Sequence, residues 1–208
     1  MEGSASAPTH PQIELEPSEW QPRATWAGAR LLCGAAAFFL ISFVFAYFYL
    51  RAQDPDNQWK VGAVNPSIGL GILILVCLLL SAGALRAAVG HPERTVSAGG
   101  AALGLALLSV LLQVIEWTTL GFGPASGGFA SVFIGWTVFY SVLTVACAYW
   151  IEIVVASAWR RRREGAVATP ADVLSDTALV NAGVEACSFF WSFFVFNGLV
   201  LFVLLYLL

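Results

Sequence analysis

Residues 109–123 read SVLLQVIEWTTLGFG, an apolar run that is interrupted by Gln113 and Glu116. These two side chains are three residues apart, so they share one face of a helix. The run belongs to an apolar stretch long enough to cross a membrane. A carboxyl group buried there needs a hydrogen-bonding partner, because burying it alone is costly. The stretch therefore predicts a membrane-spanning helix with a polar pair on one face.

The whole chain has the composition of an integral membrane protein. Of its 208 residues, 59% are hydrophobic and only 11% are charged, whereas soluble domains carry about 25% charged residues. A soluble globule of this size could not bury so much apolar surface and still present a polar exterior. The formal charge of −3 is small and no large basic surface is indicated, so nucleic acid is not expected as a partner.

Five apolar stretches reach the length of about 20 residues that a transmembrane helix needs. They are residues 27–50, 66–88, 97–120, 129–158 and 181–208. Their apolar residues are continuous rather than alternating, which argues against barrel strands. We therefore predict an all-α membrane bundle of five helices after a polar N-terminal tail over residues 1–26. The longest connection, Trp159–Val180, is polar and carries a turn or helix-start signal at residues 169–172.

The basic residues predict how this bundle is oriented. The fourth stretch is followed directly by a run of four arginines: Arg160, Arg161, Arg162 and Arg163. Lys and Arg concentrate on the cytoplasmic side of membrane proteins. With the N-terminus cytoplasmic and the C-terminus outside, eight of the ten basic residues fall on the cytoplasmic side, and only Arg51 and Lys60 do not. An alternative role for the arginine run is the binding of anionic lipid.

The chain offers few ligands for a cofactor. Its two histidines, His10 and His91, lie outside the spans, and its only methionine is Met1. Haem iron in membrane bundles is commonly held by His or Met, and copper by His, Cys or Met. The cysteines have no CxxC or Cys–His spacing and are interpreted as small packing residues: Cys33, Cys77, Cys147 and Cys187. We expect no haem, copper or catalytic residue on this chain.

Other small and polar residues within the spans indicate helix packing. Gly100 and Gly104 form a small-xxx-small step, which is typical of close helix contacts. Asn197, near the middle of the last stretch, is expected to hydrogen-bond across a helix interface. Glu152 and Glu185 lie toward the predicted cytoplasmic side, where the interface can solvate them. A transport pathway is the alternative reading, and the lack of an internal repeat argues against it.

Several stretches, in the same order, resemble cytochrome c oxidase subunit III. LLQVIEW at 111–117 is similar to the family's LLQxxEY/W, and GFASVFIGWTVFY at 128–140 parallels its YGSTFFxxTGFHGLH. EACSFFWSF at 185–193 parallels EAxxxYWHFVDVVW, and FFLISFVFAYFYLR at 38–51 is similar to the helix that ends AYFxLR in bacterial five-helix forms. The likeness extends from Arg30 to the C-terminus. The residues shared in the two longer motifs are Ser131, Phe133, Thr137, Phe139, Glu185, Ala186, Trp191 and Phe193.

At several polar positions of the family, this chain carries other residues. The family's glutamate in the first shared helix falls at Ala36, and two of its histidines fall at Tyr140 and Leu143. A third histidine falls at Ser192, and an aspartate falls at Val195. Roles in proton uptake or lipid binding that depend on those side chains are therefore not transferred to this chain.

The resemblance implies a subunit without a redox centre in the bacterial plasma membrane. Such a subunit packs beside subunit I and other respiratory subunits, retains phospholipid and supports sustained turnover. Haem and copper are expected in the partner subunits, which reduce oxygen with electrons from cytochrome c. Candidates for lipid contact or helix packing are Gln113, Glu116, Glu185, Trp191 and Asn197. Two alternatives stay open: an accessory subunit of a nitric oxide reductase or quinol oxidase, and an independent small transporter.

Overall fold

The structure, a computed structural model, describes residues 20–54, 59–60, 65–164 and 170–208, and it contains helices and no strands in these ranges. The elements are α1 (Trp20–Ala52), α2 (Ile68–Ala88), α3 (Thr95–Thr119), α4 (Gly128–Glu164), α5 (Pro170–Phe202) and a short π-helix, η1 (Val203–Leu207). Each of the five long helices contains a stretch that is long and apolar enough to span a membrane. The predicted all-α, five-helix membrane bundle is confirmed, and the chain is a multi-pass membrane protein.

Three of the helices run further than the apolar stretches predict. α1 begins at Trp20, inside the predicted tail, and α4 continues through the arginine run to Glu164. α5 begins at Pro170, so most of the polar segment 159–180 is helical rather than a connection. Proline is favoured at the first helical position, where no N–H is needed. α4 has 37 residues and is about 55 Å long, so it extends past a hydrocarbon core of about 30 Å. Residues 165–169 lie outside the described ranges.

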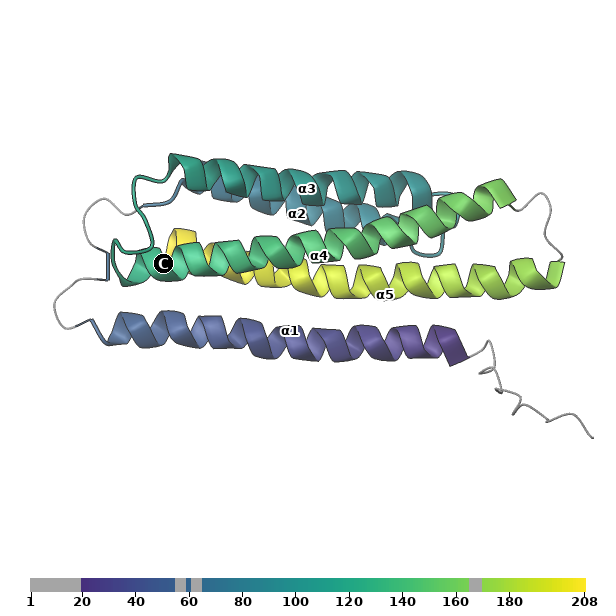
Figure 1. The fold of residues 1–208 in the computed structure, drawn as a ribbon, viewed down its shortest axis with the longest axis horizontal. Helices are drawn as coiled ribbons and strands as arrows, with labels where there is room; N and C mark the ends of the chain where they lie inside the picture. Colours follow the sequence, from purple (N-terminus) through teal and green to yellow (C-terminus); the bar gives the residue numbers. More distant parts are fainter. Residues whose placement is uncertain (1–19, 55–58, 61–64, 165–169) are drawn as a thin grey trace, which may run out of the picture.

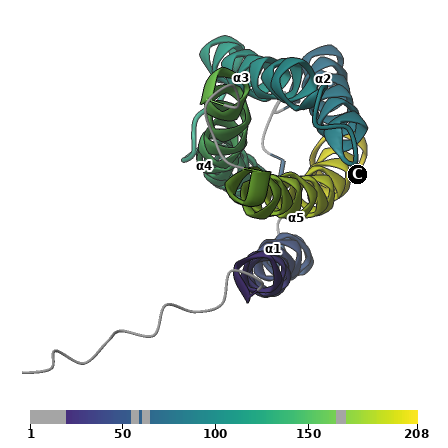
Figure 2. The same ribbon diagram turned by 90° about the vertical axis from the view of Figure 1, so that its right-hand side faces the viewer.

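Four helices form a ring, and α1 lies outside it (Figure 2). α2 packs on α3, α3 on α4, α4 on α5, and α5 on α2. α1 lies against α5 and α4 on the outer side of the ring. Only 11% of the most apolar window of α1 is buried, against 50% for α5. The ring therefore has an interior to which four helices contribute, while most of the α1 surface faces away from the other helices.

Small residues let α3 approach its neighbours closely. Its buried residues follow helical spacing: Thr95, Gly99, Ala102, Ala106, Ser109, Gln113 and Glu116. A Cβ atom added to Gly99 would lie 2.5 Å from Cγ2 of Val155 on α4, which is too close for two carbon atoms. Gly100 and Gly104 are exposed, and no described atom lies within 4 Å of a Cβ added to either. The predicted small-xxx-small contact at those two glycines is therefore wrong, because the packing face lies one residue away.

Aromatic rings attach α1 to the ring of helices. Phe39 stacks on Phe139 of α4 with 4.3 Å between the ring centroids, and Phe43 stacks on Trp136 of α4 at 5.6 Å. The α1 side chains with hydrogen bonds in the described ranges bond within α1 itself. Among the described residues, the attachment of α1 consequently rests on side-chain packing, whereas the ring also has buried hydrogen bonds between its helices.

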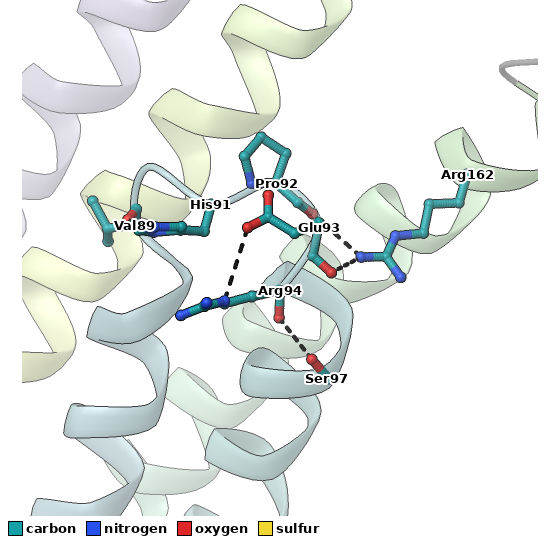
Figure 3. A network of polar contacts seen from close by, with 7 residues as sticks. All are labelled: Val89, His91, Pro92, Glu93, Arg94, Ser97 and Arg162. Carbon is teal, nitrogen blue, oxygen red and sulfur yellow. Dashed lines mark hydrogen bonds and ion pairs between the residues drawn. The ribbon is translucent and has the colours of Figure 1, made fainter.

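One end of the bundle collects most of the arginines. Figure 1 places the start of α1, the α2–α3 turn, the end of α4 and the start of α5 at this end, which is the predicted cytoplasmic end. Arg162 of α4 donates hydrogen bonds to the backbone carbonyls of Pro92 and Glu93 in the α2–α3 turn (Figure 3). Arg163 lies over the ring of Trp159, with 3.9 Å between its Cζ and the ring centroid. Part of the arginine run thus fixes the α4 extension against the bundle.

Candidate functional site

The polar pair of α3 lies inside the ring, in a hydrogen-bonded cluster with Tyr206. Gln113 Nε2 donates to Glu116 Oε2 at 2.8 Å, and Tyr206 Oη donates to the same oxygen at 2.6 Å. The Glu116 side chain is 0% exposed. Gln113 and Glu116 share one face of α3, and the bond from Tyr206 joins that face to a residue 90 positions later in the chain.

Two local features bring Tyr206 to Glu116. Residues 203–207 form a π-helix, which has a wider turn than an α-helix. A Cβ atom added to Gly71 of α2 would lie 2.6 Å from the Tyr206 ring, so glycine provides the room that this ring occupies. Sequence reasoning did not single out Tyr206. The available signal was a phenol hydroxyl in an otherwise apolar C-terminal stretch, since such a group needs a partner when buried.

The second carboxyl oxygen of Glu116 is unsatisfied. Oε1 is buried and has no hydrogen-bond partner among the described groups. A buried polar atom without a partner costs about 1–3 kcal/mol. The carboxyl group can therefore still accept a further donor at Oε1.

Trp191 belongs to a second buried hydrogen-bonded chain, which joins three helices. Its Nε1 donates to Ser81 Oγ of α2 at 3.0 Å, and Ser81 Oγ donates to the Ala102 carbonyl of α3 at 2.7 Å. Ser81 is 0% exposed and Trp191 is 1% exposed. The packing role that sequence suggests for Trp191 thus includes a polar contact with Ser81, a partner that lies 110 residues away.

Two more hydrogen bonds, one part-buried and one buried, join the remaining neighbours in the ring. Trp117 Nε1 of α3 donates to Thr137 Oγ1 of α4 at 3.0 Å. Tyr140 Oη of α4 donates to the Phe194 carbonyl of α5 at 2.9 Å. The Tyr140 hydroxyl group lies in the ring interior and links two helices.

The other predicted site residues have different surroundings. Asn197 Nδ2 donates to the Phe193 carbonyl at 2.8 Å, within its own helix. The expected bond across a helix interface is therefore wrong, because a short polar side chain can bond back to the preceding turn. Glu185 is half-buried and lies 15 residues after the start of α5, at the middle of this helix. Glu152 is exposed on α4.

The seam between α1 and the ring is hollowed along two successive stretches. Near the predicted cytoplasmic end, a groove of about 550 Å³ is lined by Arg23, Trp26, Arg30, Asn181 and Glu185, among others. Further along α1, an apolar groove of about 290 Å³ is lined by Leu32, Ala36, Phe39, Leu143, Cys147 and Phe194, among others. The charged groove is thus followed along the same seam by an apolar one.

The described part of the chain contains no group of three or more His, Cys, Asp or Glu side chains placed to hold a metal ion. All four cysteines are free. Cys77, Cys147 and Cys187 are buried and Cys33 is half-buried. These positions fit the packing role that the sequence predicts for them.

Replacing Glu116 with alanine is expected to destabilise the bundle. The change removes the acceptor of Gln113 and Tyr206, and hydrogen bonds between membrane helices contribute about 1–2 kcal/mol at most. The free energy of unfolding, measured by titration with SDS in mixed micelles, should fall by this amount. Glu152→Ala is the matched control, since that carboxylate is exposed. An unchanged stability of Glu116→Ala, or an equal loss in the control, would contradict the role of the cluster.

No protein-family model matches the sequence, and no curated protein is similar to it at a significant level. The likeness to cytochrome c oxidase subunit III is accordingly one of short, ordered motifs.

Proposed function

We propose that the chain is a non-catalytic membrane subunit of an aerobic haem–copper oxidase, of the cytochrome c oxidase subunit III type, in a bacterial plasma membrane. It packs beside subunit I and the other respiratory subunits, retains phospholipid, and supports sustained oxygen reduction and proton pumping. The haem and copper centres belong to the partner subunits, which carry out the electron transfer. This chain contributes a helical scaffold and a surface that holds lipid.

The observation that carries the proposal is the two-part groove along α1. Arg23 and Arg30 are seven residues apart, which places them on one face of the helix, and both line the charged groove. Trp26 between them is a residue type that favours the membrane interface. Glu185 contributes one negative charge, so the described lining residues of the groove, with two arginines and one glutamate, carry one net positive charge. This end of the seam suits the phosphate of an anionic lipid headgroup.

Together, the two grooves cover the depth that an acyl chain needs. From Arg30 to Phe39, α1 rises by about 14 Å, close to half of a hydrocarbon core of about 30 Å. The apolar lining residues of α1 lie within this interval, and those of α4 and α5 face them. One lipid of the cytoplasmic leaflet, with its phosphate at the arginines and a chain along the seam, therefore fits both grooves.

The residues shared with the family also support a scaffold role. Gln113 and Glu116 connect α3 to the C-terminal turn, and Trp191 connects α5 to α2. Glu185 lines the lipid groove. Each of these side chains contributes to helix contacts or to the groove, which agrees with a subunit whose chemistry takes place elsewhere in the complex.

Isolation of the complex tests this function. The tagged chain is purified in mild detergent from its native membranes, and a reduced-minus-oxidised absorption spectrum is recorded. We expect large partner subunits and an a-type haem signal to co-purify. A b-type signal alone would instead favour an accessory subunit of a nitric oxide reductase or quinol oxidase. A colourless chain without partners that transports a solute in liposomes would overturn the proposal.

Lipid retention tests the groove itself. The double variant Arg23→Gln/Arg30→Gln is expected to lose bound phosphatidylglycerol, because each arginine near the surface contributes about 1 kcal/mol, or roughly 30-fold in affinity for the pair. Native mass spectrometry of the purified protein measures the retained lipid. The control Arg86→Gln/Arg160→Gln removes the same charge at the same end, outside the groove. Equal losses in both variants would contradict a specific site.

A further inference from the structure

The ring interior contains a small cavity beside the Glu116 cluster. Its volume is about 20 Å³, which exceeds the roughly 10–15 Å³ that one water molecule needs. The polar residues that line it are Gln113, Thr137, Tyr140 and Tyr206, from α3, α4 and η1. A cavity of this size with several polar walls takes up water, whereas an apolar cavity stays dry.

The polar groups around the cavity have unused hydrogen-bonding capacity. Tyr140 Oη and Tyr206 Oη each donate one hydrogen bond, to the Phe194 carbonyl and to Glu116 respectively, and each can still accept one. Gln113 donates through one N–H to Glu116, which leaves its other N–H and its carbonyl oxygen. One water molecule could therefore accept from Gln113 and donate to a tyrosine oxygen, within the two to four bonds that buried waters make.

The polar groups near the cavity lie at different depths along the ring axis. Glu116 lies three residues before the end of α3 at Thr119, or about 4–5 Å along the axis. Tyr140 lies 12 residues after the start of α4 at Gly128, or about 18 Å along the axis from the same end of the bundle. Glu116 is therefore nearer to this end of the bundle than Tyr140 is.

We propose that this cavity binds one water molecule that connects the Glu116 cluster to Tyr140. The water completes a column of hydrogen bonds in the ring interior, from the Glu116 carboxyl group near the predicted outer surface to the Phe194 carbonyl near the middle of the membrane. Glu116 and Tyr140 have no direct hydrogen bond, so the water couples them. The column is a property of the ring and is independent of any partner subunit or of lipid along α1.

Infrared spectroscopy of the full chain in lipid nanodiscs tests this coupling. The difference between wild type and Glu116→Gln identifies the carboxyl bands of Glu116. Tyr140→Phe is expected to shift these bands, although Tyr140 does not contact Glu116, because it removes one partner of the water. Ser81→Ala is the matched control, since it removes a buried hydroxyl group from another part of the ring. Unchanged Glu116 bands in Tyr140→Phe, or equal shifts in both variants, would overturn the proposal.

A measurement on the unmodified protein keeps the test independent of how the variants fold. Exchange of H₂¹⁶O for H₂¹⁸O shifts the O–H stretching band of a bound water molecule. We expect wild type to show one narrow isotope-sensitive band, which Ser81→Ala retains and Tyr140→Phe loses. Absence of such a band from the wild-type spectrum would overturn the proposal, even if the chain is found in an oxidase complex.

Discussion

Replacing Trp191 with alanine is expected to lower the free energy of unfolding by about 3–5 kcal/mol, the cost of removing a large buried aromatic side chain. Trp191 is 1% exposed and stacks on Phe194, with 5.6 Å between the ring centroids. Its indole also holds Ser81 through the bond from Nε1. Lipid tails give little hydrophobic drive for association between helices, so packing of this kind holds a membrane bundle together.

The variant Trp191→Phe separates packing from hydrogen bonding. It keeps an aromatic ring against Phe194 and loses the donor to Ser81, so the expected cost is about 1 kcal/mol. Both variants are measured by SDS unfolding in mixed micelles, with circular dichroism as the signal. If alanine cost no more than phenylalanine, packing at Trp191 would not be a main source of ring stability.

Replacing Gly198 with alanine is expected to cost about 1–3 kcal/mol, as overpacking of a filled interior does. The new Cβ atom would lie 2.5 Å from Tyr140 Oη and 3.1 Å from its Cζ. Tyr140 cannot move aside easily, because its ring stacks on Phe194 at 4.3 Å and its hydroxyl group donates to the Phe194 carbonyl. Helix propensity has the opposite effect, because alanine is more favourable than glycine in a helix by about 1 kcal/mol.

A double-mutant cycle identifies the cause of this loss. Tyr140→Phe removes the oxygen that meets the new methyl group, so Gly198→Ala/Tyr140→Phe should be more stable than the sum of the single changes predicts, by about 1 kcal/mol or more. Gly100→Ala is the control, because no described atom lies within 4 Å of its added Cβ. Its stability should equal or exceed that of wild type. If the stability effects of Gly198→Ala and Tyr140→Phe were strictly additive, the close contact with Tyr140 would not be the cause of the loss in Gly198→Ala.

The errors of the sequence-based predictions share one physical origin. Gly100 and Gly104 were expected to pack and are exposed, while the adjacent Gly99 forms the close contact. Asn197 was expected to bond to another helix and bonds within α5. Lipid is as apolar as the interior of the bundle, so a spanning helix is hydrophobic on every side. Its sequence therefore gives little information about which face is turned inward.

The sequence by itself determined the number of helices, their approximate positions and the shared face of Gln113 and Glu116. Backbone polar groups in lipid must be satisfied within the segment, so each apolar stretch of sufficient length has to form a helix. The tertiary structure alone decided that α1 lies outside the ring, and that Tyr206 and Ser81 are the partners of Glu116 and Trp191. These partners are 90 and 110 residues apart in the chain. Such contacts depend on how helices of similar composition pack, which local patterns of hydropathy do not encode.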